Sequence, residues 1–140
     1  MAIRNNCPEE LFTIIMRRLM LEIAQRICQK ENCSCLITGE SLGQVSSQTM
    51  GAIVCTNEAC GMPMFPPCIG LDKAEIVEVE SRIGTFDTSI LPYEDCYTVF
   101  TPKHLRTRST VVDVKVGQAR FDFEPMICKA IENIAFKIVR

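Results

Sequence analysis

The segment from Gly39 to Gly43 reads G-E-S-L-G and could carry chemistry. It matches the G-x-S-x-G pattern of serine hydrolases, where a sharp turn between a strand and a helix exposes the serine as a nucleophile. Such a hydrolase would use Ser41, His104 and one aspartate, Asp72, Asp87 or Asp95. So short a pattern arises easily by chance, and the hydrolase fold needs several more strands than this chain predicts. A Ser41 hydrolase is therefore the weaker hypothesis.

The same segment is also suited to a nucleotide. Gly39 follows an apolar stretch that predicts a strand, and open parallel sheets bind ligands beyond the carboxyl ends of their strands. A glycine there lets the backbone approach a base or a phosphate closely. Gln44 and Gln48 carry amides that can pair with a nucleobase or a ribose edge. The alternative is a solvated loop leading into a capped helix, and spacing alone does not decide between the two.

Nine cysteines are many for a chain of 140 residues. Their number is odd and no secretory leader precedes them, so a disulfide framework is not expected. No two have the C-x-x-C spacing of zinc sites, and the single histidine has no histidine partner. We expect seven or eight to be small buried hydrophobes and expect no metal. The alternative is a metal or iron–sulfur cluster drawn from Cys33, Cys35, Cys55 and Cys60.

Composition predicts one globular, partial domain over residues 1–140. The hydrophobic fraction is 47%, the charged fraction 23% and the net charge -2. The apolar runs are too short for a membrane span, and the first residues lack the apolar core of a signal peptide. We therefore expect a cytoplasmic protein with no membrane partner. Because the net charge does not attract nucleic acid, RNA contacts would be local, for example through Lys103–Arg108, or made by another domain.

The elements that would position these residues alternate between helix and strand. Apolar spacing predicts helices over 8–30, around 50–54, over 72–83 and over 125–139, with short strands over 33–38 and 62–65. Ser46 or Ser47 is expected to cap the second helix. Asp72 and Glu75 are expected to cap the third, which Gly84 ends.

Two stretches are less regular. Residues 85–108 are expected to be mostly loop. The sequence does not decide between strand and helix for residues 109–124, although the alternation of β-branched residues in Val111–Val116 favours a strand. The order of elements predicts an α/β fold with a parallel sheet of two or three short strands. So small a sheet is not expected to be stable on its own. We therefore expect a half-domain that is completed by a partner polypeptide or a second copy.

Four segments together resemble the tRNA 4-thiouridine synthetase family, also called tRNA sulfurtransferases, which is linked to thiamine biosynthesis. They are Ile14–Ala24 (IIMRRLMLEIA), Thr38–Thr49 (TGESLGQVSSQT), Pro66–Ile76 (PPCIGLDKAEI) and Ile83–His104 (IGTFDTSILPYEDCYTVFTPKH). Their spacing fits the family without gaps over roughly two-thirds of the chain. The resemblance implies the C-terminal half of a PP-loop ATP pyrophosphatase domain, which has an adenine-nucleotide α-hydrolase-like, Rossmann-like fold.

The resemblance also implies a reaction and its participants. The family uses ATP, with Mg²⁺, to adenylate a tRNA uridine, and a persulfide sulfur then displaces AMP to give 4-thiouridine. Members serve thiazole synthesis for thiamine as well. The partners implied are tRNA and a cysteine desulfurase as the sulfur donor.

Five residues match functional positions of the family. Arg17, Gly39 and Gln48 match positions that contact the nucleotide, Lys73 matches a lysine needed for activity, and Cys96 matches the cysteine of sulfur transfer. A cation such as Arg17 or Lys73 can neutralise charge that develops on a phosphate. The alternative for both is an ordinary helix side chain exposed to solvent.

The basic residues that follow Cys96 favour its reactive thiolate, whereas the acidic Glu94 and Asp95 before it disfavour the thiolate.

The sequence departs from the family in its glycines. The family's phosphate-binding SGG-x-DS loop is absent, and none of the seven glycines is followed by another. The ferredoxin-like and THUMP RNA-binding domains and the rhodanese-like domain of some members are also missing. We therefore expect ATP binding that is weak or dependent on a partner carrying the N-terminal half, and little adenylation by the chain alone. The alternative is a non-catalytic remnant of the family that dimerises or only binds.

Overall fold

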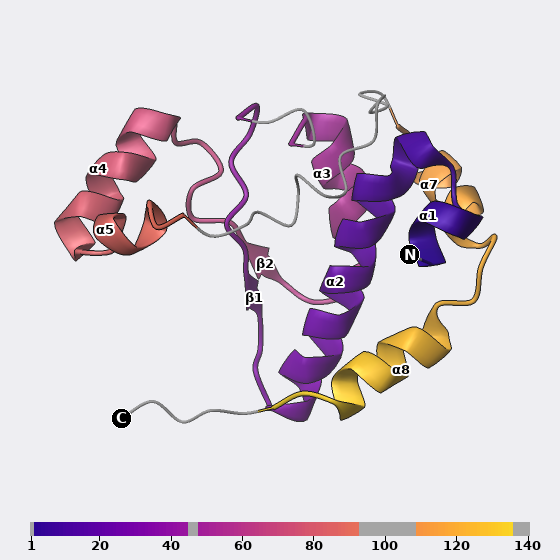
Figure 1. Ribbon diagram of the computed structural model, residues 1–140. Coiled ribbons are helices and arrows are strands. Elements are labelled where there is room, and N and C mark those ends of the chain that lie inside the picture. The colour runs from indigo at the N-terminus through magenta and orange to yellow at the C-terminus, as the bar shows by residue number, and fades with distance from the viewer. Residues whose placement is uncertain (1, 45–47, 93–108, 136–140) are drawn as a thin grey trace.

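The computed structural model describes residues 2–44, 48–92 and 109–135 (Figure 1). The elements, in chain order, are α1 (Ala2–Asn6), the 3-10 turn η1 (Glu9–Leu11), α2 (Phe12–Lys30), β1 (Leu36–Ile37), α3 (Met50–Asn57), β2 (Met64–Phe65), α4 (Lys73–Ile83), α5 (Phe86–Ser89), α7 (Val111–Gln118) and α8 (Glu124–Glu132).

Strands β1 and β2 form a parallel pair joined through helix α3, which confirms the α/β class. Leu36 pairs with Met64 and Ile37 with Phe65. Each strand has two residues, fewer than predicted. Pro66 follows β2 directly, and because proline has no backbone N–H it cannot extend the ladder. The side chains of Ile37 and Phe65 are 73% and 59% exposed, so the pair leaves apolar surface uncovered.

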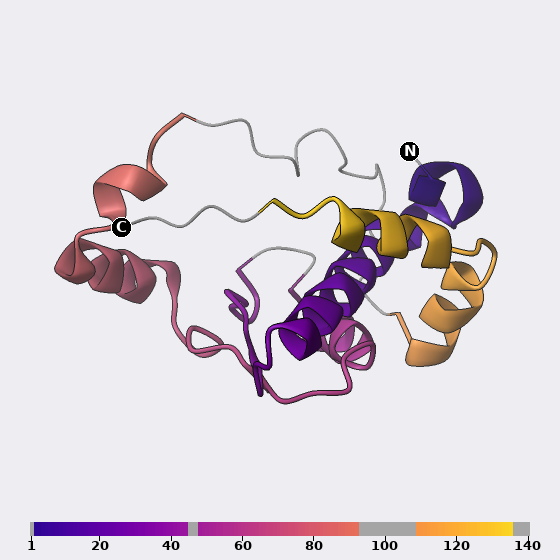
Figure 2. The ribbon, with the colours of Figure 1, turned by 90° about the horizontal axis from the view of Figure 1, so that it is seen from below.

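Helix α2 lies at the centre of the fold. It packs against α1, α3, α7 and α8, and in Figures 1 and 2 these helices gather around it while α4 and α5 lie beyond the strands, away from α7 and α8. The core is built around the fully buried Ile15 of α2 and Val114 of α7. Helix α4 contributes no buried residue. The part of the fold that carries the core is therefore separate from α4.

The long helix predicted over 8–30 is interrupted at its start. Pro8 is extended and caps the short turn η1, and α2 begins only at Phe12. The two pieces meet at Leu11, whose φ of -100° and ψ of 0° are not helical. Leu11 is 2% exposed. The apolar spacing that suggested one helix therefore reflects burial of both pieces against the same core.

The caps predicted for α4 are confirmed. Asp72 and Glu75 form a reciprocal capping box, and Gly84 ends the helix in the left-handed region at φ 75°, where glycine avoids the Cβ clash. For α3 the prediction of Ser46 or Ser47 was wrong. Its cap is Thr49, whose hydroxyl accepts a hydrogen bond from the Ala52 amide at 3.2 Å.

The strand favoured at Val111–Val116 is a helix, α7. Thr110 and Asp113 form a capping box at its start, which supplies local helix signals. Val114 is fully buried, and Gly117 lies so close to the turn η1 that a Cβ there would be 3.0 Å from a methyl carbon of Leu11. Packing at residues 114 and 117 thus overrides the β propensity of the valines.

Helix α8 is shorter than predicted. It begins at Glu124, with Pro125 in its first turn as expected, and ends at Glu132 rather than at residue 139. Asn133 follows as the C-cap and its side-chain amide donates to the Lys129 carbonyl at 2.7 Å. A polar side chain that satisfies a terminal carbonyl stabilises a helix end at that point. Residues 136–140 lie outside the described part of the chain.

The expectation that most cysteines are buried was wrong. Of the eight in the described ranges, all are free thiols: Cys7, Cys28 and Cys55 are buried, Cys35, Cys60 and Cys68 are half-buried, and Cys33 and Cys128 are exposed. The exposed and half-buried thiols come mainly from the turns and loops around the strands. Nowhere in these ranges do three or more cysteine, histidine or acidic side chains converge so as to hold a metal ion.

None of the helices in the described ranges has the length and apolar character needed to cross a membrane.

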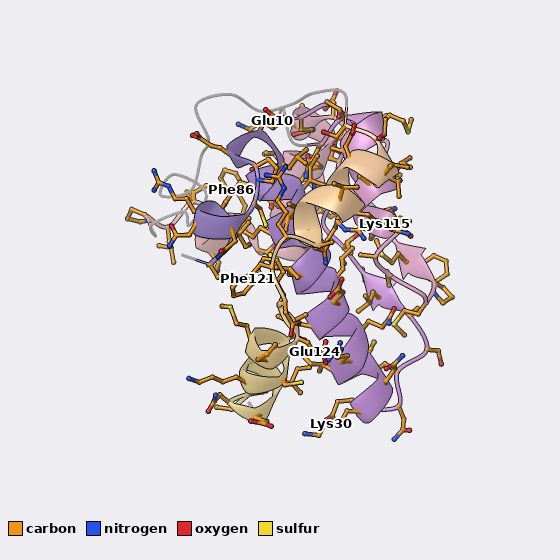
Figure 3. The ribbon with its side chains drawn as sticks, turned by 90° about the vertical axis from the view of Figure 1, so that its right-hand side faces the viewer. Glu10, Lys30, Phe86, Lys115, Phe121 and Glu124 are labelled. Atoms are coloured by element: carbon orange, nitrogen blue, oxygen red, sulfur yellow. The ribbon has the colours of Figure 1, made fainter. Side chains whose placement is uncertain are left out.

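An exposed ion pair joins α2 to α8. Arg26 donates to both carboxylate oxygens of Glu124, at 2.6 and 2.7 Å, and Glu124 lies at the α2-facing start of α8 in Figure 3. These hydrogen bonds lower the pKa of Glu124 from 4.5 to about 2.

The Arg26–Glu124 pair predicts a pH dependence. Because the folded state lowers the pKa of Glu124, the pair stabilises the fold above pH 4.5 and this stabilisation is lost as the pH falls toward about 2. A carboxyl NMR titration should place the Glu124 midpoint clearly below its ordinary value in the wild type and closer to that value in Arg26→Gln, where the hydrogen bond from Cys128 remains. An ordinary midpoint in the wild type would contradict the pairing.

Candidate functional site

A cavity of about 240 Å³ lies where the chain leaves β1. It contains three of the residues singled out from the sequence, Arg17, Gly39 and Gln48, although they come from α2, from the loop after β1 and from the approach to α3. Met20, Leu21, Thr38 and Glu40 complete its lining. The structure thus brings together, at the carboxyl end of a parallel strand, residues that are up to 31 positions apart.

The secondary structure explains this convergence. Arg17, Met20 and Leu21 are three and four residues apart and so share one face of α2. Residue 38 is the first after β1, so the loop turns over that face as it leaves the strand. A Cβ placed on Gly39 would meet no atom within 4 Å. The backbone at Gly39 therefore borders open space that a flat ligand can approach.

The cavity contains a buried ion pair. Arg17 donates from Nη2 to Oε1 of Glu40, and the two side chains are only 12% and 7% exposed. Arg17 is therefore largely buried, and the alternative of an ordinary exposed helix arginine does not hold. Its pairing with a carboxylate also reduces the net positive charge that it can offer to a phosphate.

Two polar atoms of the cavity lining lack partners. Within the described ranges, Oε2 of Glu40 and Oγ1 of Thr38 are buried without a hydrogen bond. Buried polar groups are nearly always paired in folded proteins, because an unpaired one loses its hydration without compensation. The cavity therefore offers hydrogen-bonding capacity that the protein itself does not use.

Lys73 lines a second cavity of about 480 Å³, formed by the loops after β1 and β2. The two loops are tied together: the Leu42 amide donates to the Ile69 carbonyl at 3.0 Å, and the Gln44 amide side chain donates to the Leu71 carbonyl at 3.3 Å. Lys73 is exposed in the first turn of α4. It does not line the cavity of Arg17, but the loop after β1 borders both cavities.

Ser41 has a structural role in this loop. It is 4% exposed, and its hydroxyl donates to the Leu71 carbonyl at 2.8 Å. The next helix begins only at Met50, so Ser41 does not stand at the strand-to-helix turn that exposes a hydrolase nucleophile. The arrangement does not support the Ser41 hydrolase.

Several predicted residues lie outside the described residues. Cys96, His104 and the basic run Lys103–Arg108 all fall within 93–108. Glu40, in contrast, is a site residue that the sequence reasoning missed. Its partner Arg17 is 23 positions away, and no local pattern signals so distant a pairing.

The neighbour of Arg17 on α2 points to a different part of the fold. Arg18 is 4% exposed and donates to the Cys55 carbonyl, to Gln118 Oε1 at 2.7 Å and to Glu58 Oε2 at 3.0 Å. Lys115, labelled in Figure 3, contacts the other oxygen of Glu58 at 2.5 Å. Its hydrogen bond and that from Arg18 lower the pKa of Glu58. This Arg18 network links α2 to the end of α3 and to α7.

Comparisons with known proteins agree on one family. Residues 1–123 match a family model described as "Thiamine biosynthesis protein (ThiI)". The chain is 48% identical over 133 residues to a probable tRNA sulfurtransferase of Acetivibrio thermocellus, covering 95% of this chain and 34% of that protein. It is 46% identical to a probable tRNA sulfurtransferase of Finegoldia magna, covering 99% and 36%. The chain thus spans about a third of the length of these curated relatives.

A solved structure supports the same relation. The fold matches a 4-thiouridine synthetase in complex with RNA and with bound ATP, with a TM-score of 0.86 and 32% sequence identity. The match covers 94% of this chain and 34% of that one. It confirms the α/β fold inferred from the order of elements.

Proposed function

The chain belongs to the thiamine biosynthesis protein (ThiI) family, and from this we propose that it forms the C-terminal part of a tRNA sulfurtransferase catalytic domain. The enzyme would adenylate a tRNA uridine with ATP and transfer persulfide sulfur to make 4-thiouridine, and would also serve thiazole synthesis for thiamine. The observation that carries the proposal is the cavity where Arg17, Gly39 and Gln48 meet. The ATP and RNA of the similar solved structure support the same assignment.

The proposed reaction has two steps. The C4 oxygen of the uridine attacks the α-phosphorus of ATP and pyrophosphate leaves. The terminal sulfur of a persulfide then attacks C4, and AMP leaves with the oxygen. A second thiol attacks the inner sulfur and breaks the S–S bond, which releases 4-thiouridine and leaves a disulfide that an external thiol reductant reduces. In this scheme Arg17, Gly39 and Gln48 contact the nucleotide, Lys73 stabilises the negative charge that develops on the phosphate, and the thiol of Cys96 takes part in the sulfur transfer.

Other components would come from outside these residues. A triphosphate needs a cradle of backbone N–H groups, and the 140 residues contain no Gly-Gly pair of the kind found in the SGG-x-DS loop. We infer that a segment carrying that loop joins this one and that ATP binding depends on it. Mg²⁺ would be held mainly by phosphate oxygens, as is usual for this ion.

The proposed partners follow from the same scheme. They are tRNA, bound through separate RNA-binding domains, a cysteine desulfurase as sulfur donor, and the segment with the phosphate loop. The exposed Ile37 and Phe65 on the strand pair give that segment or a second copy an apolar surface to cover. The reaction would take place in the cytoplasm, where tRNA is available.

The test is a reconstituted thiolation. The polypeptide that contains these residues would be purified under mild conditions with everything that accompanies it. It would then be incubated with unmodified tRNA, Mg²⁺-ATP and a persulfide donor. Mass spectrometry of the tRNA nucleosides should find 4-thiouridine only when ATP is present. A preparation that holds the phosphate loop but neither releases pyrophosphate nor forms 4-thiouridine would instead identify a non-catalytic member of the family.

Lys73 gives a more specific prediction. Replacing it with alanine should lower the rate of pyrophosphate release by about 100-fold or more, the usual effect of removing one group that stabilises a transition state. Stability should be unchanged or slightly higher, because a cation in the first turn of α4 opposes the helix dipole. The matched control is Lys129→Ala, at an exposed lysine of α8. Equal rates in the two variants would remove Lys73 from the mechanism.

A further inference from the structure

The carboxylate of Glu40 is divided between two environments. Glu40 is only 6% exposed, and its Oε1 accepts a hydrogen bond from Arg17. Its Oε2 is buried and has no hydrogen-bond partner in the described part of the chain. The protein therefore satisfies one oxygen of the carboxylate, whereas the hydrogen-bonding capacity of the other oxygen is unused.

The location of Glu40 indicates where that ligand lies. Glu40 lines the same cavity as Gly39 and Gln48, and its ion pair with Arg17 fixes the carboxylate on the cavity wall. The unpaired Oγ1 of Thr38 belongs to the same wall. Two unsatisfied polar atoms on one small cavity indicate that a polar group of a ligand completes their hydrogen bonds.

The chemistry of these atoms restricts the ligand group. An ionised carboxylate only accepts hydrogen bonds, so Oε2 needs an N–H or O–H donor. Phosphate oxygens repel it and must lie elsewhere. The hydroxyl of Thr38 and the amide of Gln48 can each donate or accept. The wall therefore fits the nucleoside end of a nucleotide, which presents donors beside acceptors on both the base and the ribose.

We propose that Glu40 determines which nucleotide the cavity binds, by accepting through Oε2 a hydrogen bond from an N–H or O–H donor of the nucleoside. Arg17 then acts as a positioning residue, which orients the Glu40 carboxylate. This inference rests on the proposed nucleotide site and adds a specificity determinant to it. Two groups of a nucleoside can donate such a hydrogen bond: an exocyclic amino group of the base and a ribose hydroxyl.

The test compares the binding of ATP with that of analogues that each lack one donor. Calorimetry would use the polypeptide that contains these residues, with its co-purifying partners. The probes would be ATP, purine riboside triphosphate, 2′-deoxy-ATP and 3′-deoxy-ATP. In the wild type one analogue should bind about 10- to 100-fold more weakly than ATP, as expected for loss of a hydrogen bond to a charged group. That analogue identifies the donor.

The variant Glu40→Gln completes a thermodynamic cycle. It keeps the size of the side chain but removes the charge, so the ratio between ATP and the discriminated analogue should fall at least several-fold. Glu78→Gln, at an exposed residue of α4, is the matched control and should keep the full ratio. Melting curves would show whether each variant is folded, and Arg17→Lys, which keeps a cation beside Glu40, should retain part of the ratio.

The outcomes separate the two proposals. If the wild type binds no ATP even with its partners, the proposed nucleotide site fails. If it binds ATP but no analogue is discriminated, or if Glu40→Gln keeps the full ratio, the site stands and the role of Glu40 is overturned.

Discussion

Replacing Arg18 with alanine is expected to lower the free energy of unfolding by about 2–4 kcal/mol. The Arg18 guanidinium is buried and satisfies three partners on two elements: the Cys55 carbonyl, Glu58 and Gln118. Alanine would remove the donor of the buried Cys55 carbonyl, and a buried group left unsatisfied costs about 1–3 kcal/mol. The packing of the buried Arg18 stem is lost as well. Glu58 contributes less, because it is one-third exposed and keeps its contact with Lys115. Urea unfolding followed by circular dichroism measures it.

The matched control for Arg18 is another arginine of the same helix. Arg26 also forms an ion pair that joins α2 to a distant element, but its pair with Glu124 is exposed. Exposed pairs contribute about 0–1 kcal/mol, so Arg26→Ala should have a small effect. A similar loss in both variants would show that burial of Arg18 is not what makes its network important. The double variant Arg18→Ala with Glu58→Ala should lose less than the sum of the two single losses, because the residues interact.

Replacing Cys96 with serine is expected to abolish sulfur transfer while leaving adenylation in place. Cys96 lies outside the described residues and its assignment rests on the YEDC segment shared with the family. A serine hydroxyl neither carries persulfide sulfur nor forms a disulfide with it. The yield of 4-thiouridine should therefore fall by about 1,000-fold or more, as expected when a nucleophile is removed. Pyrophosphate release, which reports adenylation, should continue.

Two exposed cysteines provide the controls for Cys96. Cys33 and Cys128 are accessible to a persulfide donor, so their serine variants test whether exposure alone is sufficient. At Cys128 a hydrogen bond with Glu124 raises the pKa of the thiol, which lowers its thiolate fraction and its reactivity at neutral pH. Both variants should retain full thiolation. Loss of thiolation in Cys33→Ser but not in Cys96→Ser would assign the sulfur-transfer role to Cys33, in the turn after α2.

The parts of the fold that the sequence predicted well are those with strong local signals. Helix α4 has its capping box and terminal glycine within thirteen residues, and the sequence predicts both. Helix α7 was missed because its valines alternate as in a strand, whereas its conformation depends on the contacts of Val114 and Gly117 with α2 and with the turn before it. No local pattern of residues contains those contacts.

The candidate site shows the same limit. The sequence indicates Arg17, Gly39 and Gln48 through a resemblance to a family, and the structure brings them to one cavity. The burial of Arg17 against Glu40 was not predicted, because it depends on how the loop after β1 lies across α2. The exposure of the cysteines was misjudged for a similar reason. Their residue type suggested burial, but several lie in turns and loops whose packing only the tertiary structure defines.

The two adjacent arginines of α2 have a consequence for ligand affinity. Successive residues of an α-helix point about 100° apart, so Arg17 reaches the cavity wall while Arg18 is tied to α3 and α7. A rotation of α2 that moved Arg17 would break the bonds of Arg18. The α2 side of the cavity is therefore held in place by the core. The nucleotide binding proposed above would then cost little conformational entropy at that side, and the rigidity of the core would contribute to affinity at the surface.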